Sequence, residues 1–140
     1  MIRELRTKLT AAFERMPGWG VVSAYVFGSH AAGRAHRESD IDIGVLLDRT
    51  AHPTSRDRFE VRTRLAGALA HALGADAVDL VVLDDAPPHL VRWVMTEGVR
   101  IFCTDPEADH AARRTALLRA ADLEPFLRRA RRVKLRAMAR

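Results

Sequence analysis

Hydrophobic residues recur every three to four positions in several stretches of the chain, the spacing of a helix with one apolar face. The stretches are residues 2–15, 55–73, about 87–97 and about 122–139. Ser55 is a candidate N-cap for the second predicted helix and Gly74 would stop it, while Pro87 and Pro88 suit the first turn of the third. The last predicted helix is basic, with its arginines around an apolar stripe.

Runs of β-branched and aromatic residues between these stretches predict strands. They occupy residues 21–27, 41–47, 77–83 and 99–103. The first two runs are close enough to pair like a hairpin. Strands that alternate with helices favour an α/β (α+β) fold, with a small mixed β-sheet flanked by helices and a basic C-terminal helix.

The composition is that of a globular chain, which we expect to form one domain over residues 1–140. Hydrophobic residues make up 48% of the chain and charged residues 29%, which is sufficient for a core and argues against disorder. No apolar run approaches the ~18 residues of a membrane span, and no secretory signal is recognisable. We therefore expect a cytoplasmic protein without a membrane partner. The single cysteine, Cys103, excludes an internal disulfide and is expected in the core.

The net charge of +5 is unevenly distributed. Residues 113–140 hold ten of the 23 Arg and Lys residues but only two of the 18 Asp and Glu residues. Such a tail can bind nucleic acid, but no series of aromatic residues interleaves with the charges as on a strand-stacking surface. We favour a solvated helix or contact with an acidic partner over nucleic-acid binding.

The candidate chemistry begins with two acids. Asp40 and Asp42 stand two positions apart at the start of the second predicted strand, so their side chains should project from one face, with the Cα atoms about 6 to 7 Å apart. Two carboxylates at ~6 Å repel by roughly 3 kcal/mol at an effective dielectric of ~20. Mg²⁺ would offset that cost, because it takes one or two carboxylates and completes its shell with water and phosphate oxygens.

A candidate phosphate-binding turn precedes these acids. Gly28 follows the first predicted strand, and a glycine there lets backbone approach a phosphate closely. Ser29 adds a hydroxyl donor. Arg34 lies between the turn and the acids and could neutralise further phosphate charge.

Asp79 is the candidate third acid. It stands alone among the apolar residues of the third predicted strand, and an acid in such a strand is rarely buried without a partner. Three carboxylates would allow two Mg²⁺ ions, one activating the attacking oxygen and one steadying the leaving pyrophosphate. The same position would let Asp79 act as general base.

The spacing of Gly28-Ser29, Asp40-x-Asp42 and a later strand acid resembles the DNA-polymerase-beta-like nucleotidyltransferase superfamily. More closely, the chain is similar to the minimal nucleotidyltransferases, the MNT antitoxins paired with HEPN-domain ribonuclease toxins. Three further stretches also look like that group: residues 78–83 followed by 86–88, residues 97–99, and residues 122–125. The resemblance implies the polymerase-beta-like fold.

The resemblance also implies roles and a reaction. Gly28 and Ser29 would hold the triphosphate of ATP, Asp40 and Asp42 would bind magnesium, and Asp79 would be the third acid. The implied reaction transfers AMP from ATP to a tyrosine of the HEPN toxin, which silences it. One departure is Ala32, where many relatives carry arginine, so Arg34 is a candidate to replace that contact.

The sequence therefore predicts a Mg²⁺-dependent protein adenylyltransferase that acts as an antitoxin. One alternative is transfer to a small molecule or an RNA end, although the chain is too short for an added acceptor-binding domain. Another is an antitoxin that blocks its partner by binding alone and keeps the acids as relics.

Overall fold

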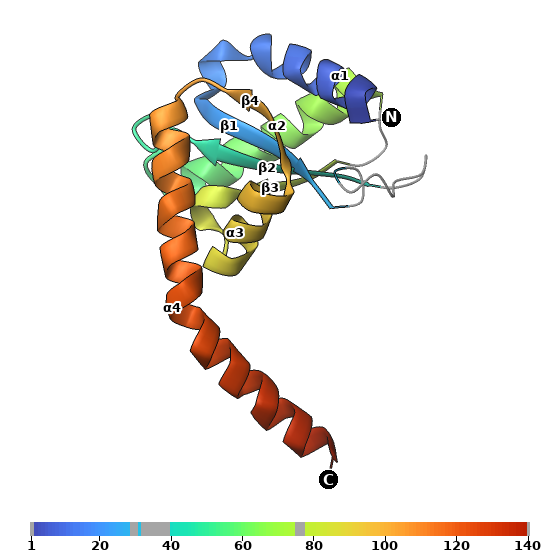
Figure 1. Cartoon of the computed structure of the whole chain (residues 1–140). Helices are drawn as coiled ribbons and strands as arrows, with labels where there is room; N and C mark the ends of the chain where they lie inside the picture. The colour runs from blue at the N-terminus through green and yellow to red at the C-terminus, as the bar shows by residue number, and fades with distance from the viewer. Residues whose placement is uncertain (1, 29–30, 32–39, 75–77, 140) are drawn as a thin grey trace.

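A four-stranded mixed sheet forms the centre of the protein, seen in a computed structural model that describes residues 2–28, 31, 40–74 and 78–139 (Figure 1). Its strands are β1 (Val21–Phe27), β2 (Ile41–Leu47), β3 (Val78–Val82) and β4 (Val99–Cys103), in the order β3-β2-β1-β4. β1 pairs antiparallel with both β2 and β4, whereas β2 and β3 are parallel. The predicted mixed sheet and the predicted β1–β2 pairing are confirmed.

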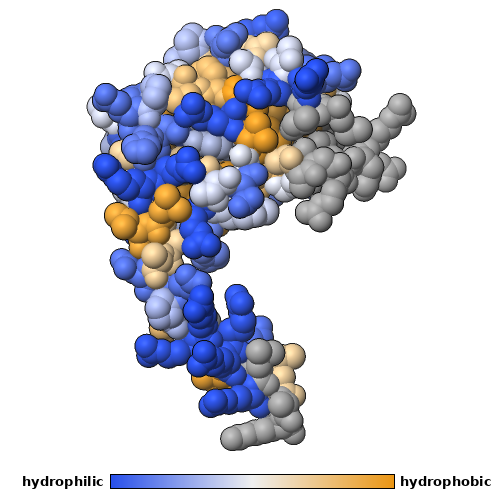
Figure 2. Space-filling model, in the orientation of Figure 1, coloured by the Kyte–Doolittle hydropathy of each residue, from blue (hydrophilic) through white to orange (hydrophobic). Residues whose placement is uncertain are grey.

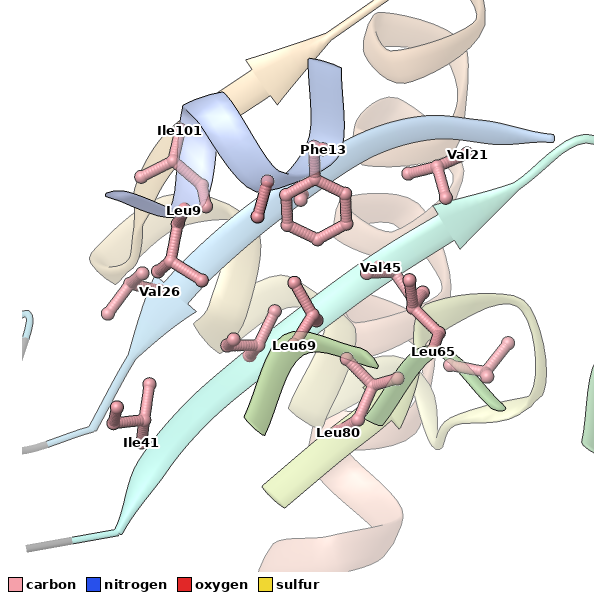
Figure 3. Packing of buried hydrophobic residues seen from close by; sticks show 14 of the residues in the cluster. Leu9, Phe13, Val21, Val26, Ile41, Val45, Leu65, Leu69, Leu80 and Ile101 are labelled. Atoms are coloured by element: carbon pink, nitrogen blue, oxygen red, sulfur yellow. The ribbon is translucent and has the colours of Figure 1, made fainter. Parts of the chain in front are cut away.

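Helices cover both faces of this sheet (Figure 1). On one face lie α1 (Ile2–Glu14) and α2 (Ser55–Leu73). Figure 3 shows Phe13 of α1 and Leu65 of α2 directed at strand residues such as Val45, all within one buried cluster. On the other face, α3 (Pro88–Glu97) and the first half of α4 (Pro106–Ala139) bury Val94 and Ala116 against β1 and β2.

Local differences from the expected boundaries have simple causes. The N-cap of α2 is Thr54, not Ser55, because the Thr54 side chain accepts a hydrogen bond from the Asp57 N–H. Gly74 ends that helix in the left-handed conformation, as expected. β3 ends at Val82 because Leu83 begins a short 3-10 helix. Cys103 is only partly buried, since it lies on the edge strand β4.

The largest difference concerns the last helix, which begins at Pro106 instead of near residue 122. Pro106 occupies the first turn, and the Asp105 carboxylate accepts a hydrogen bond from the Ala108 N–H. The expected start was wrong because Pro125 lies inside the helix rather than at its beginning. At 34 residues, α4 is about 50 Å long. Of the helices that the structure describes, none is long and apolar enough to cross a bilayer.

A buried polar contact ties α4 to the sheet. The Tyr25 hydroxyl donates a 2.6 Å hydrogen bond to Asp109 Oδ1, and Arg100 Nη1 donates to Asp109 Oδ2 at 3.1 Å. Asp109 is buried, so this carboxylate depends on both partners. Burial, and then the hydrogen bond to Asp109, raise the pKa of Tyr25 above its usual value.

Replacing Tyr25 by Phe is expected to lower the free energy of unfolding by about 1–3 kcal/mol at neutral pH, because buried Asp109 then keeps a single partner. The pKa of Tyr25 is raised by folding, so its contribution is complete below the unfolded pKa near 10 and is lost as the pH rises further. Urea unfolding at about pH 7 and about pH 11 measures this: the gap between wild type and variant should narrow at the higher pH. A gap that stays constant would contradict the assignment.

Candidate active site

Three neighbouring strands bring the candidate residues to one end of the sheet. Phe27, the last residue of β1, pairs with Asp42 on β2, and Asp42 pairs with Asp79 on β3. Gly28 follows Phe27 directly. The parallel pairing therefore places Asp42 and Asp79 side by side, at the usual spacing of about 5 Å between adjacent strands.

The side chains of Asp42 and Asp79 point to the same face. Ile41 and Ile43 on β2, and Leu80 on β3, belong to the core beneath α1 and α2. Because side chains alternate along a strand, the intervening aspartates project to the opposite face of the sheet. Asp42 is half-buried on the central strand and Asp79 is exposed on the edge strand.

One expectation about the acids needs correction, since Asp79 is not buried but exposed on edge strand β3. Asp40 directly precedes β2, which begins at Ile41 as predicted, and is exposed. It therefore lies at the same end of the sheet as Asp42, although outside the strand itself.

The structure requires glycine at position 28, which the sequence position only suggested. Its φ is +72°, in the left-handed region that favours glycine. A Cβ built on Gly28 would collide with the carboxylate oxygen Oδ2 of Asp42. The backbone at the end of β1 therefore lies directly against the Asp42 carboxylate. Ser29 and Arg34, the other predicted phosphate contacts, lie outside the described residues.

The residues present fit a magnesium ion by their chemistry. Mg²⁺ needs only one or two protein carboxylates, and Asp42 and Asp79 supply hard oxygen donors from adjacent strands. Within residues 2–28, 31, 40–74 and 78–139, however, no three His, Cys, Asp or Glu side chains gather closely enough to hold a metal by themselves. Magnesium binding by Asp40, Asp42 and Asp79 stays a prediction.

One aromatic side chain near this end of the sheet carried no functional signal in the sequence. Trp93 of α3 is 46% exposed and lies edge-on to Phe27, with ring centroids 5.6 Å apart. In the sequence, Trp93 stands three positions after Leu90 and next to Val94, a pattern that indicates only a core or interface residue. The contact with Phe27 places an exposed indole beside the strand that leads into Gly28.

Asp84 and Asp85, whose pKa values are shifted, belong to structural contacts at the opposite end of the sheet. Asp84 accepts a 2.9 Å hydrogen bond from the N–H of Leu47, the last residue of β2, and its burial raises its pKa. Arg58 donates twice to Asp85 at 2.9 Å, which lowers the pKa of Asp85. A hollow of about 600 Å³ beside Asp84 lies there too, away from Asp42 and Asp79.

A known protein family matches most of the chain. The family described as polymerase beta, nucleotidyltransferase matches residues 8–107. The match includes Gly28, Asp40, Asp42 and Asp79, and ends at the start of α4.

Individual relatives are also similar to the chain. The protein adenylyltransferase MntA of Shewanella oneidensis is 40% identical over 91 residues, which are 65% of this chain and 60% of that protein. The chain thus matches less than two thirds of this relative's length.

Solved structures extend the likeness. A chain in a toxin-antitoxin crystal structure with AMP-PNP is 28% identical, with a TM-score of 0.63 over 96% of this chain and 98% of that chain. A chain from the complex of tri-AMPylated Shewanella oneidensis HEPN toxin with MNT antitoxin is 25% identical, with a TM-score of 0.59 over 100% of both chains.

Proposed function

We propose that this chain, which belongs to the polymerase beta nucleotidyltransferase family, transfers AMP from ATP to a HEPN-domain toxin and acts as its antitoxin. The observation that carries the proposal is the juxtaposition of Gly28, Asp42 and Asp79 on three neighbouring strands. The similarity to a protein adenylyltransferase and to toxin-antitoxin structures supports the acceptor class. Because ATP is the donor, the proposal places the protein in the cytoplasm.

In the proposed site, Asp40, Asp42 and Asp79 would hold two magnesium ions. When bound, these ions would neutralise the triphosphate and stabilise charge on the attacking and leaving oxygens. The backbone at Gly28 lies close to Asp42, and the lack of a side chain there would let a phosphate held beside the ions approach the backbone closely. Ser29 and Arg34 remain proposed phosphate contacts.

Asp79 is suited to the proton transfer. The acceptor tyrosine hydroxyl attacks the α-phosphorus of ATP, pyrophosphate leaves, and the hydroxyl proton passes to the Asp79 carboxylate. Asp79 can be reached by another protein because it is exposed on edge strand β3, while Asp42 beside it is half-buried. The exposure that contradicted our expectation of a buried acid therefore favours a large acceptor.

The intact mass of the toxin tests the reaction. After incubation of both purified proteins with ATP and MgCl₂, the toxin mass is expected to rise by whole AMP units and its ribonuclease activity to fall. Addition of EDTA should prevent both changes. Toxin that is silenced at unchanged mass would indicate an antitoxin that acts by binding alone, and labelled RNA or small molecules would indicate another acceptor.

A further inference from the structure

The second half of α4 leaves the body of the protein. Ala120 is the last buried residue of this helix, and from residue 121 to residue 138 every side chain that the structure describes is exposed. Figure 1 shows this part of α4 projecting beyond the sheet and its covering helices, and Figure 2 shows that its surface is mostly hydrophilic on the side in view. The overhang, residues 121–139, has 19 residues and is therefore about 28 Å long.

An apolar stripe continues from the body into the overhang. Ala116 and Ala120 are buried against the body. At helical spacing, further apolar residues continue on the same side of the helix. We call them the overhang stripe: Leu123, Phe126, Ala130, Val133 and Ala137. Phe126 and Val133 are each 66% exposed. Lys134 follows Ala116 by 18 residues, or five turns, so it stands on this line too.

The charges of the overhang do not stabilise it as an isolated helix. Residues 125–140 hold seven Arg and Lys residues and no acid. Arg128, Arg132 and Arg136 follow one another at four-residue spacing, where like charges destabilise a helix. Among the described residues of the overhang, Arg128 and Glu124 form an ion pair at 2.7 Å. Helices of this length are marginal in water by themselves, so a surface that covers the stripe and supplies carboxylates would stabilise the overhang.

We propose that the overhang stripe is the docking surface for the acceptor protein, through a complementary apolar face with an acidic group positioned for Lys134, which stands on the same line of the helix. The inference rests on the proposed function, because the partner meant is the toxin that receives AMP. The family match ends at residue 107. The part of the chain that carries Gly28, Asp42 and Asp79 is thus separate from the overhang. In this proposal the overhang determines which protein is bound.

Charge and apolarity together favour this occupant over others. A second copy of the chain would bring another seven basic residues and no acid against the same surface, and like charges across an interface cost affinity. Nucleic acid would satisfy the arginines but would leave Phe126 and Val133 uncovered. An acidic protein surface with an apolar centre satisfies both requirements.

The double variant Phe126→Glu and Val133→Glu tests the proposal. The dissociation constant for the cognate HEPN toxin, measured by calorimetry, should rise about 30-fold or more, because two apolar anchors are lost. The matched control is Arg132→Gln with Arg136→Gln, which makes the same change in net charge on the opposite side of the helix. The control should bind the toxin within about threefold of wild type.

Nucleotide binding separates this inference from the proposed function. Both double variants should bind ATP with Mg²⁺ like the wild type and keep the same helical circular dichroism. If wild type never labels the toxin, the proposed function fails; if it does, and the stripe variant binds the toxin as tightly as wild type, the docking inference fails. It also fails if the stripe variant loses only self-association, or only affinity for a labelled RNA, while toxin binding persists.

Discussion

Replacing Asp42 by Asn is expected to reduce AMP transfer by at least about a hundredfold, with little change in stability. The amide preserves the size of the side chain beside Gly28 and Phe27 but removes the negative charge available to a cation. Asp79 lies directly opposite on β3, so the substitution also removes a like-charge neighbour. The free energy of unfolding should stay within about 1 kcal/mol of wild type. The rate of toxin labelling and urea unfolding measure the two effects.

The matched control for this substitution is Asp48→Asn. Asp48 directly follows β2 at its other end, where its side chain accepts a hydrogen bond from the Thr50 N–H in a turn. An asparagine oxygen can accept the same bond, so this variant should retain full activity. If the Asp42 variant labels and silences the toxin at the wild-type rate, the acid pair has no catalytic role. If it silences without labelling, the protein acts by binding.

Replacing Gly28 by Ala is expected to reduce AMP transfer by about a hundredfold as well, for a steric reason. The new Cβ would occupy the space of Asp42 Oδ2, and the side chain of Asp42 would have to leave its position. A displacement of about 1 Å at a catalytic group is sufficient for a loss of this size. Because φ is positive at position 28, an alanine there would also have backbone strain of about 1–2 kcal/mol.

Gly74→Ala separates the collision from the backbone strain. Gly74 has a φ of +61°, close to that of Gly28, but a Cβ there meets nothing within 4 Å. Both variants should therefore lose about 1–2 kcal/mol of stability from the positive φ, with a further loss from the collision at position 28 alone, and only the Gly28 variant should lose activity. Equal activities in the two variants would show that the contact between Gly28 and Asp42 does not matter for transfer.

Most helices and strands could be predicted because their signals are local. The run of residues 21–27 and the helical pattern of residues 55–73 coincide with β1 and α2. The start of α4 could not be predicted from such local signals. Pro125 resembles a first-turn proline, and only the packing of residues such as Ala116 against the body shows that the helix is already formed before it.

The candidate site was predictable in its residue types more than in its geometry. The two-residue spacing of Asp40 and Asp42 pointed to a shared ligand. The exposure of Asp79 was missed, because an apolar run does not reveal whether its strand lies at an edge or in the centre of a sheet. The contacts of Tyr25 with Asp109, and of Arg58 with Asp85, join residues too far apart in the chain to suggest a pairing.

The sequence by itself determined which segments become helices or strands, where glycine is placed, and which acids are available, since these depend on neighbours along the chain. The tertiary structure alone decided that Asp42 and Asp79, 37 positions apart, become neighbours, and that Gly28 lies against the first of them. It also decided that half of α4 stays uncovered. Strand order, register and burial arise from contacts between distant segments, and the free energy of those contacts is shared over the whole core rather than encoded at any one position.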